Sequence, residues 1–311
     1  MGGEDDREIA EYDRFLRTAN PLDVRTAAAY RNRGLAWQRK GRYDKAVADF
    51  NQAVATDPIG AESYKYRGLA WCHMGQFDKA VADFSVVIRL RPKSADAYCD
   101  RGNALDKAAD SGDAASRQDG YKKAIADYTE AIRLEPRRVT AYWARGAVWD
   151  QLAEYDKAIA DYSDAIRLDL RYAAAYLSRG VARAKKGEYD KALADYDQAV
   201  RINPYYAESY HQLAWLYATC PDQKYRDGKK AFDSASMAYQ LRRGKDWQDV
   251  DTLAAAYAAY GDFRAARQWQ SKAVEMAATV KSATEKEKAE MRSRLELYKQ
   301  GKPYREEPKN K

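Results

Sequence analysis

The sequence predicts an all-α fold in which helical hairpins stack side by side into a solenoid. The first observation behind this prediction is a 34-residue unit, clearest at residues 27–60, that recurs along most of the chain. The second is a glycine that returns at one place in the unit, at Gly34, Gly68, Gly102, Gly146 and Gly180. The third is a tyrosine that returns at another, at Tyr30, Tyr64, Tyr98, Tyr142, Tyr176 and Tyr210. This spacing indicates a repeat architecture. One such unit cannot bury its apolar side alone, so neighbouring units must stack.

Within one repeat the apolar residues fall on two helical stripes. Counting Ala27 as position 1, positions 4, 8 and 11 share one face of a first helix, and positions 20, 24, 27 and 28 share one face of a second. Gly41 ends the first helix, where a residue without Cβ can take a positive φ, and Pro58 stops the second. Each repeat is therefore expected to form an antiparallel pair of helices.

This pattern resembles the tetratricopeptide repeat (TPR), which has the same period and the same order of aromatic, glycine, alanine and proline positions. The residues that carry the resemblance in the first repeat are Tyr30, Gly34, Trp37, Tyr43, Ala46, Phe50, Ala53 and Pro58. The resemblance covers about residues 27–276. It implies a right-handed superhelical solenoid of about seven repeats, of the kind found in bacterial TPR proteins.

The chain divides in order as follows. Residues 1–26 are expected to form an N-terminal capping helix or half repeat, and residues 27–280 the solenoid, with repeats at 27–60, 61–94, 95–138, 139–172, 173–206, 207–246 and 247–280. Residues 281–300 should form a C-terminal capping helix, since a solenoid end needs an apolar face inward and a polar face outward. Residues 301–311 are a tail.

The third repeat carries an insertion, because the step from Gly102 to Gly146 is 44 residues instead of 34. The inserted segment, about residues 108–118, is rich in Ala, Ser, Asp and Gly. We expect it to lengthen the turn between the two helices as a solvent-exposed loop, with a docking element as the alternative.

Composition excludes several protein classes. A chain of 311 residues with 46% apolar and 32% charged residues can bury a large interior. It has no run of 18 apolar residues, and its first residues resemble no secretion signal, so a cytoplasmic protein is expected. A chain whose leader had been removed would look the same. Cys72, Cys99 and Cys220 lack Cys-x-x-Cys spacing, which agrees with a reducing compartment.

A charge pair is built into the repeat. Position 7 is arginine and position 23 is aspartate in the same five repeats, giving Arg33 and Asp49, Arg67 and Asp83, Arg101 and Asp127, Arg145 and Asp161, and Arg179 and Asp195. These positions face each other in an antiparallel pair, so the charges should meet. In the last two repeats position 7 is Leu213 and Leu253, and both charges are lost together. We therefore expect structural ion pairs, inside or between repeats, in preference to ligand contacts.

Positions 2, 5, 9 and 12 form the opposite stripe of the first helices. The resemblance implies that this stripe lines a concave groove that binds a peptide or helix of a partner protein. The expected groove residues are Lys65, Leu69, Cys99, Asn103, Trp143, Ala147, Leu177, Val181, His211 and Trp215. The two tryptophans make the best candidate surface, because exposed tryptophan commonly marks interfaces. The alternative is that the C-terminal helix fills this groove.

The motifs of catalysis are missing. His73 and His211 are the only histidines and lie far apart in the sequence, and no phosphate-binding glycine loop occurs. We expect a non-enzymatic interaction scaffold or adaptor without cofactor or metal, whose partner is another protein. The alternative is binding of nucleic acid or an anionic surface through the basic C-terminal third, with Lys224, Arg226, Lys229, Lys230, Arg242, Arg243 and Lys245. Nucleic acid is the less favoured partner, because acidic residues are interleaved with these basic ones.

Overall fold

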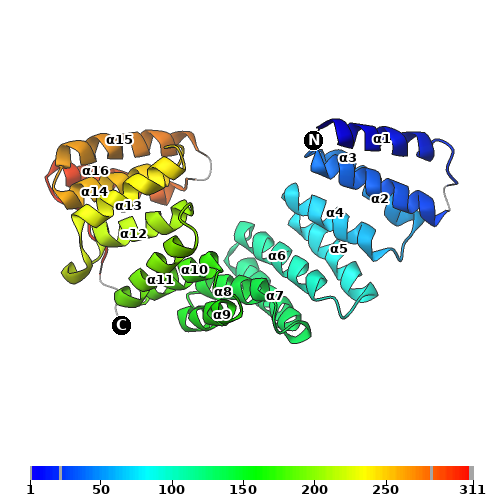
Figure 1. Ribbon diagram of the computed structural model, residues 1–311, viewed down its shortest axis with the longest axis horizontal. Coiled ribbons are helices and arrows are strands. Elements are labelled where there is room, and N and C mark those ends of the chain that lie inside the picture. The colour runs from blue at the N-terminus through cyan, green and yellow to red at the C-terminus, as the bar shows by residue number, and fades with distance from the viewer. Residues whose placement is uncertain (1, 21–22, 281–282, 308–311) are drawn as a thin grey trace. The chain divides into compact units, whose positions relative to one another are not determined.

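The fold is described by a computed structural model that covers residues 2–20, 23–280 and 283–307. The first helices of the repeats are α2 (Val24–Arg39), α4 (Ala61–His73), α6 (Ala95–Ser111), α8 (Val139–Gln151), α10 (Ala173–Lys185), α12 (Ala207–Thr219) and α14 (Trp247–Tyr260). The second helices are α3 (Tyr43–Thr56), α5 (Phe77–Leu90), α7 (Ala114–Leu134), α9 (Tyr155–Leu168), α11 (Tyr189–Ile202), α13 (Gly228–Leu241) and α15 (Phe263–Thr279). Helices α1 (Gly2–Leu16) and α16 (Glu285–Lys299) precede and follow them in the chain (Figure 1). A 3-10 turn, η1 (Gln223–Tyr225), precedes α13.

The prediction of an all-α fold built from helical hairpins is confirmed. Helices follow one another without a strand throughout the described ranges, and within each of two compact units consecutive helices pack as neighbours. They form two compact units, residues 1–152 with α1 to α8 and residues 153–311 with α9 to α16. In unit 1 the hairpins α2–α3, α4–α5 and α6–α7 stack in order, with α1 against α2 and α8 against α7. In unit 2 the hairpins are α10–α11, α12–α13 and α14–α15, with α9 against α10 and α16 against α15.

The packing inside a hairpin explains why glycine recurs at position 8 of the repeat. A Cβ built on Gly68 would lie 2.8 Å from the ring of Phe84, and one on Gly34 would lie 2.7 Å from the ring of Phe50. Both rings are fully buried at position 24 of their repeats. The glycine therefore makes room for an aromatic ring from the second helix, and packing of this density leaves no space for a methyl group.

The prediction for the insertion is wrong. Instead of a long loop at 108–118, helix α6 continues to Ser111 and α7 already begins at Ala114, so the added residues extend both helices of the hairpin. The physical reason is local. Alanine favours helix, and Asp113 caps α7 by accepting a hydrogen bond from the backbone N–H of Ser116, so only a short turn at Gly112 remains.

The two flanking helices cover the ends of their units. In α1, Ile9 is buried. Asp13 and Asp5 of the same helix form ion pairs with Arg33 and Arg39 of α2, respectively. Helix α16 starts with a capping box between Thr284 and Glu287. It buries Met291 and Tyr298 completely. No helix in the described part of the chain is both long and apolar enough to cross a membrane.

Candidate functional site

The repeated arginines and aspartates lie together in four repeats. In each, the arginine Nε and Nη2 donate to the two carboxylate oxygens of the aspartate, at 2.5 to 3.0 Å. These pairs are Arg33–Asp49, Arg67–Asp83, Arg101–Asp127 and Arg179–Asp195. All four aspartates are buried. Arg145 and Asp161 lie in different units, so their pairing stays a prediction.

The third nitrogen of each arginine reaches the preceding element. Nη1 of Arg67 donates to Asn51 Oδ1 at 2.8 Å, and Nη1 of Arg101 donates to Ser85 Oγ at 3.1 Å. Arg145 and Arg179 donate in the same way to Thr129 and Ser163. The guanidinium also lies over the tyrosine at position 4, as Arg67 does over Tyr64 at 5.4 Å. One side chain thus joins both helices of its own repeat and the repeat before it.

The expected groove residues of unit 1 differ in exposure. Asn103 is exposed and accepts a hydrogen bond from the Tyr128 hydroxyl at 2.8 Å. Lys65, Leu69, Trp143 and Ala147 are half-buried. Cys99 is buried, and burial raises the pKa of its thiol to about 11, so it presents no reactive thiolate near neutral pH.

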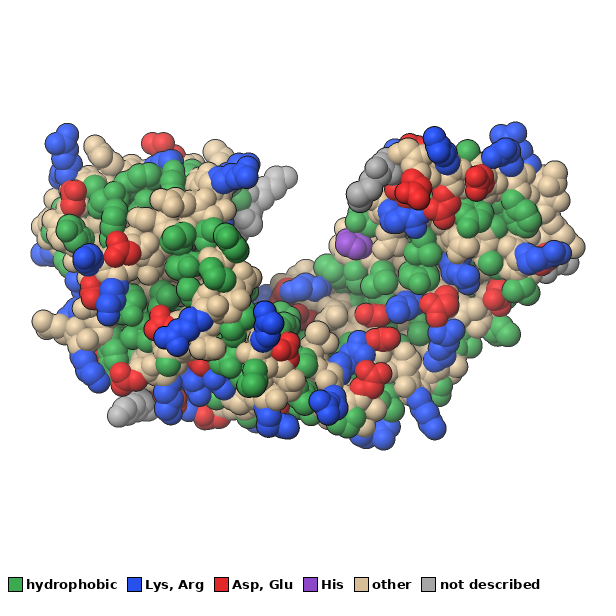
Figure 2. Space-filling view, in the orientation of Figure 1, with side chains coloured by type: hydrophobic (Ala, Val, Ile, Leu, Met, Phe, Trp, Pro, Cys, Tyr) green, Lys and Arg blue, Asp and Glu red, His purple; other side chains and the backbone are tan. Residues whose placement is uncertain are grey.

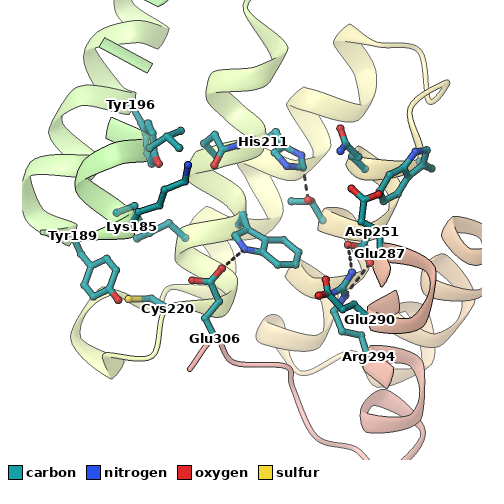
Figure 3. A pocket seen from close by; sticks show the side chains of 18 residues that line it. Lys185, Tyr189, Tyr196, His211, Cys220, Asp251, Glu287, Glu290, Arg294 and Glu306 are labelled. Carbon is teal, nitrogen blue, oxygen red and sulfur yellow. Dashed lines mark hydrogen bonds and ion pairs between the residues drawn. The ribbon is translucent and has the colours of Figure 1, made fainter. Parts of the chain in front are cut away.

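In unit 2 the expected stripe lines a pocket of about 380 Å³ (Figure 3). Val181 of α10 and both His211 and Trp215 of α12 lie on its wall. Leu177 is buried among Tyr196, Leu213 and Leu216, so its side chain faces the core and not the pocket. Tyr189 and Tyr196 of α11 and Trp247 of α14 add further aromatic surface.

A buried ion pair closes one side of this pocket. Arg294 of α16 donates from Nε to Asp251 Oδ1 at 3.1 Å and from Nη2 to Oδ2 at 2.8 Å. Gln270 donates to the same aspartate at 2.6 Å. The guanidinium carbon of Arg294 lies 5.4 Å from the ring centres of both Trp215 and Tyr304. The pair fixes α16 against α14 and places a cation over the Trp215 ring.

The chain's own C-terminal segment covers another side. Glu306 accepts a hydrogen bond from Trp215 Nε1 at 2.8 Å, and its backbone N–H donates to the carbonyl of Thr219 at 2.8 Å. Arg305 donates to the carbonyl of Ala218 at 2.7 Å. These carbonyls end α12 and have no partner within the helix, so the segment acts as their cap. The groove at Trp215 is thus partly filled by the chain itself, by α16 and the segment that follows it.

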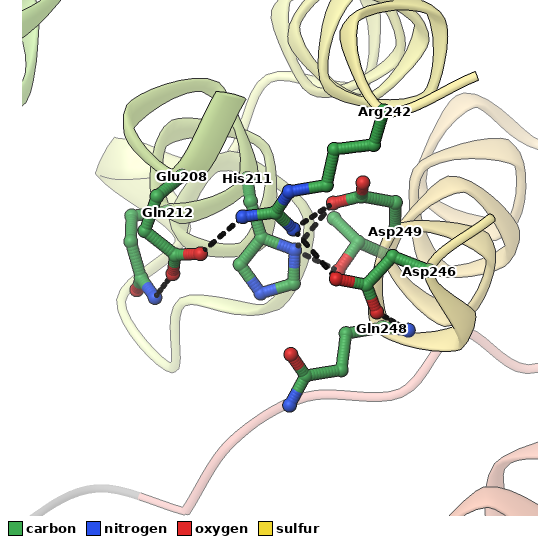
Figure 4. A network of polar contacts seen from close by, with 8 residues as sticks. Glu208, His211, Gln212, Arg242, Asp246, Gln248 and Asp249 are labelled. Atoms are coloured by element: carbon green, nitrogen blue, oxygen red, sulfur yellow. Dashed lines mark hydrogen bonds and ion pairs between the residues drawn. The ribbon is translucent and has the colours of Figure 1, made fainter. Parts of the chain in front are cut away.

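Behind the pocket, a network of charges joins α12, α13 and α14 (Figure 4). Arg242 donates to Glu208 at 2.6 Å, to Asp249 at 2.9 Å and to Asp246 at 3.0 Å. Burial alone would raise the pKa of Glu208, but the charges of His211 and Arg242 and the hydrogen bond from Gln212 outweigh it and lower that pKa. Glu208 therefore stays ionised and holds the base of the pocket together.

The basic residues of the C-terminal third are distributed among acidic partners. Arg242 is held by three carboxylates, Lys224 lies 3.5 Å from Asp190, and Lys230 lies 3.8 Å from Asp227. Figure 2 shows acidic and basic side chains interleaved over the visible face of each unit. In the described ranges, no group of His, Cys, Asp and Glu side chains is arranged to hold a metal ion.

Sequence reasoning found part of this pocket and missed the rest. The stripe rule placed Val181, His211 and Trp215, and extending it to the seventh repeat would have added Gln248 and Asp251. Arg294 and Glu306 lie beyond the repeats, where no periodic pattern assigns a facing residue. No signal in the sequence pairs Trp215 with Glu306.

Two family models match the chain, and both are described as tetratricopeptide repeat. One matches residues 27–58 and 173–206, and the other matches residues 109–166. A search of curated proteins gives no significant match.

Solved structures of similar fold agree with these matches. The MamA protein is 27% identical with a TM-score of 0.50, over 59% of this chain and 94% of that one. PilF of Pseudomonas aeruginosa is 19% identical with a TM-score of 0.56, over 72% of this chain and 94% of that one. A thermophilic TPR protein of Thermus thermophilus is 21% identical with a TM-score of 0.50, over 60% of this chain and 96% of that one. The last two likenesses bear on the fold alone.

Proposed function

Because the chain is a tetratricopeptide-repeat protein, we propose that it is a non-enzymatic scaffold whose unit 2 pocket binds an extended peptide of a partner protein. The observation that carries this proposal is the pocket itself. It includes residues at positions 2, 5, 9 and 12 of α10, α12 and α14, and four of its lining side chains are aromatic: Tyr189, Tyr196, Trp215 and Trp247. Pockets of about 300 to 1,000 Å³ with apolar walls and a few polar groups are typical binding sites.

The size of the pocket favours an extended peptide over a helix. A space of about 380 Å³ holds one or two side chains, whereas an α-helix with its side chains is about 10 Å across. The neighbouring segment supplies an intramolecular example. Arg305 and Glu306 bind the end of α12 through backbone carbonyls, so this surface already accommodates extended chain. We therefore assign the pocket to a peptide in extended conformation.

The pocket is poorly arranged for catalysis. His211 Nδ1 lies 3.2 Å from Thr252 Oγ1 and 3.3 Å from Asp249 Oδ1, so hydroxyl and carboxylate compete for one ring nitrogen. A catalytic triad needs them on opposite nitrogens. Asp249 is also fully buried and does not line the pocket. Desolvation raises the pKa of the nearby Cys220 thiol, so it is a poor nucleophile.

The test blocks the pocket without removing a core contact. Ala184 lines the pocket and is half-buried, so Ala184→Phe places a ring in the binding space. Ala115 is exposed on α7 of unit 1, and Ala115→Phe is the matched control. An array of capped twelve-residue peptides of varied sequence is probed with the labelled full-length protein and with each variant. Thermal unfolding checks that both variants fold.

We expect the wild type and Ala115→Phe to bind a common set of peptides and Ala184→Phe to lose about thirtyfold in affinity for them. Peptides that bind all three proteins equally would place the binding surface elsewhere. An absence of binding by the wild type would contradict the peptide-binding function.

A further inference from the structure

The charges around the unit 2 pocket are unequal once its internal ion pair is set aside. Asp251 and Arg294 are both buried and neutralise each other through two hydrogen bonds. Of the remaining lining residues, Glu287, Glu290 and Glu306 are acidic, and Lys185 is basic. The pocket carries an excess of negative charge whether or not His211 is charged, because three carboxylates face one lysine. Figure 3 shows Glu287 and Glu290 on the α16 side, across the pocket from Lys185.

The three glutamates are held mainly by neutral groups. Glu306 accepts its hydrogen bond from the indole of Trp215. Glu287 accepts from the backbone N–H of Thr284, as in a capping box, and also from the Thr284 hydroxyl. Glu290 has Lys286 at 3.9 Å, and that lysine is largely exposed to solvent. Neutral donors orient a carboxylate but leave its charge in place, so the field of these groups remains directed at the pocket.

Aromatic rings adjoin the acidic side. Trp247 and Glu287 line this pocket and also a second, neighbouring one, so they form a common rim. Trp215 lines the same pocket and already has the guanidinium of Arg294 over its ring. Rings beside carboxylates suit a long cationic side chain, whose methylene stem packs on the ring while its head meets the carboxylate.

Resting on the proposed function, we propose that the partner segment is a basic peptide and that one of its lysine or arginine side chains enters the pocket toward Glu287 and Glu290. The charge complementarity is local to α16 and does not extend to the chain as a whole, whose net charge is +7. The pocket therefore favours a basic segment even though the protein as a whole carries a net positive charge. An acidic peptide would meet three carboxylates, and its binding would be opposed.

The experiment changes charge and leaves shape nearly intact. Glu287→Gln/Glu290→Gln removes two charges of the pocket, and glutamine at 287 can still complete the capping box. Glu285→Gln/Glu296→Gln removes two charges from exposed positions of the same helix outside the pocket. Affinities are measured by fluorescence anisotropy for the best peptide from the array and for two variants of that peptide. One variant has Gln in place of the basic residue, and the other has Glu. Each is measured at low and at high salt.

We expect the basic peptide to bind about tenfold more weakly to the pocket variant than to the control variant, with the Glu-containing peptide weakest of all. We also expect salt to weaken binding to the wild type more than to the pocket variant. Suppose that Ala184→Phe weakens peptide binding but that the Gln- and Glu-containing peptides bind as well as the basic one. This result would overturn the inference and leave the proposed function intact. Equal binding to the two charge variants would overturn it as well.

Discussion

The arginine at position 7 shows how much one residue does in this fold. Arg67 donates two hydrogen bonds to Asp83 across its own hairpin and a third to Asn51 of the preceding repeat, while it lies over Tyr64. Sequence spacing could predict the arginine–aspartate contact, because both positions recur. It could not predict the contact with Asn51, because that position holds Asn, Ser, Thr or Asp in the first five repeats.

The first prediction concerns this pair. Arg67→Leu alone and Asp83→Ser alone should each lower the free energy of unfolding by about 3 kcal/mol, because each leaves a buried charge without its partner. The double variant, which copies the sixth repeat with Leu213 and Ser234, should be much less destabilised than the sum. Urea denaturation of the four proteins measures the coupling. The solvent-exposed pair Arg133 and Glu130 is the control and should show little coupling, because water screens the two charges. Additive losses at Arg67 and Asp83 would contradict the pairing.

The second prediction concerns Asp106 of α6, whose negative charge lowers the stability of the folded protein. Its Oδ1 is buried without a hydrogen-bond partner, and Lys107 lies 3.6 Å from Oδ2. Burial, together with the charge of Asp110, raises the pKa of Asp106 in spite of Lys107. A raised pKa means that folding favours the protonated form. The stability that Asp106 contributes is therefore present below its ordinary pKa and lost as the pH rises through the folded pKa.

Asp106→Asn should accordingly raise the free energy of unfolding at pH 7 by about 1 kcal/mol, since the amide carries no charge. The gain should shrink as the pH is lowered toward the ordinary aspartate pKa of 3.8. Denaturation at several pH values measures the difference between variant and wild type. Asp119→Asn, at an exposed residue paired with Lys123, serves as the control and should change little. A gain that is independent of pH would show that charge is not its cause.

At the scale of elements, the turns after α2, α4, α8, α10 and α14 each hold a residue with positive φ, which is glycine in every case except one. Gly41, Gly75 and Gly187 end the first helices with φ of 70°, 70° and 78°. Ala153 holds the equivalent place between α8 and α9 with φ of 58°, where a residue with Cβ is strained. The sequence identifies the position, because the repeat period fixes where the turn must fall.

Ala153→Gly should therefore stabilise the protein by about 1 kcal/mol, the strain relieved exceeding the added freedom of the unfolded chain. The midpoint of thermal unfolding checks this. Gly75→Ala, which places a Cβ in open space at the same kind of turn, is the reverse experiment and should destabilise by a similar amount. Equal stability of Ala153→Gly and the wild type would mean that the turn holds no strain.

The insertion shows where pattern reasoning fails for an element. Its Ser, Asp and Gly residues are typical of loops, but in the fold they occupy the end of α6, the cap of α7 and the short turn between them. Once two helices are already packed side by side, extra turns at their free ends add hydrogen bonds without a new nucleus. Composition does not contain that information, because it is a consequence of the hairpin to which the segment is attached.

At the scale of the whole chain, the last repeats depart from the plan of the first five, and the pocket lies where they do. Both the glycine at position 8 and the aromatic residue at position 24 are replaced in these repeats. They are Ala214 and Ala235 in the sixth repeat, and Ala254 and Gln270 in the seventh. All four are buried. Gln270 then reaches Asp251, which holds Arg294 of α16. Loss of the ring is thus linked to attachment of the capping helix that forms one side of the pocket.

The sequence therefore predicted the general plan better than the site. Period and spacing suffice for hairpins, caps and repeated ion pairs, because these depend on neighbouring repeats. The pocket depends on contacts that occur once, such as Arg294 over Trp215 and Glu306 on the Trp215 indole. A single contact between segments distant in the sequence leaves no periodic signal.

The most direct test of peptide binding in unit 2 follows the tryptophan indole N–H signals by NMR during titration of the full-length protein with the best basic peptide from the array. Trp215 and Trp247 line the pocket, whereas Trp37 and Trp71 belong to unit 1. Each signal is assigned by Trp→Phe substitution. We predict that the Trp215 and Trp247 signals shift together and saturate with the affinity measured by anisotropy, while those of Trp37 and Trp71 stay in place. Shifts confined to Trp37 and Trp71, or a saturating peptide that leaves Trp215 and Trp247 unmoved, would contradict this.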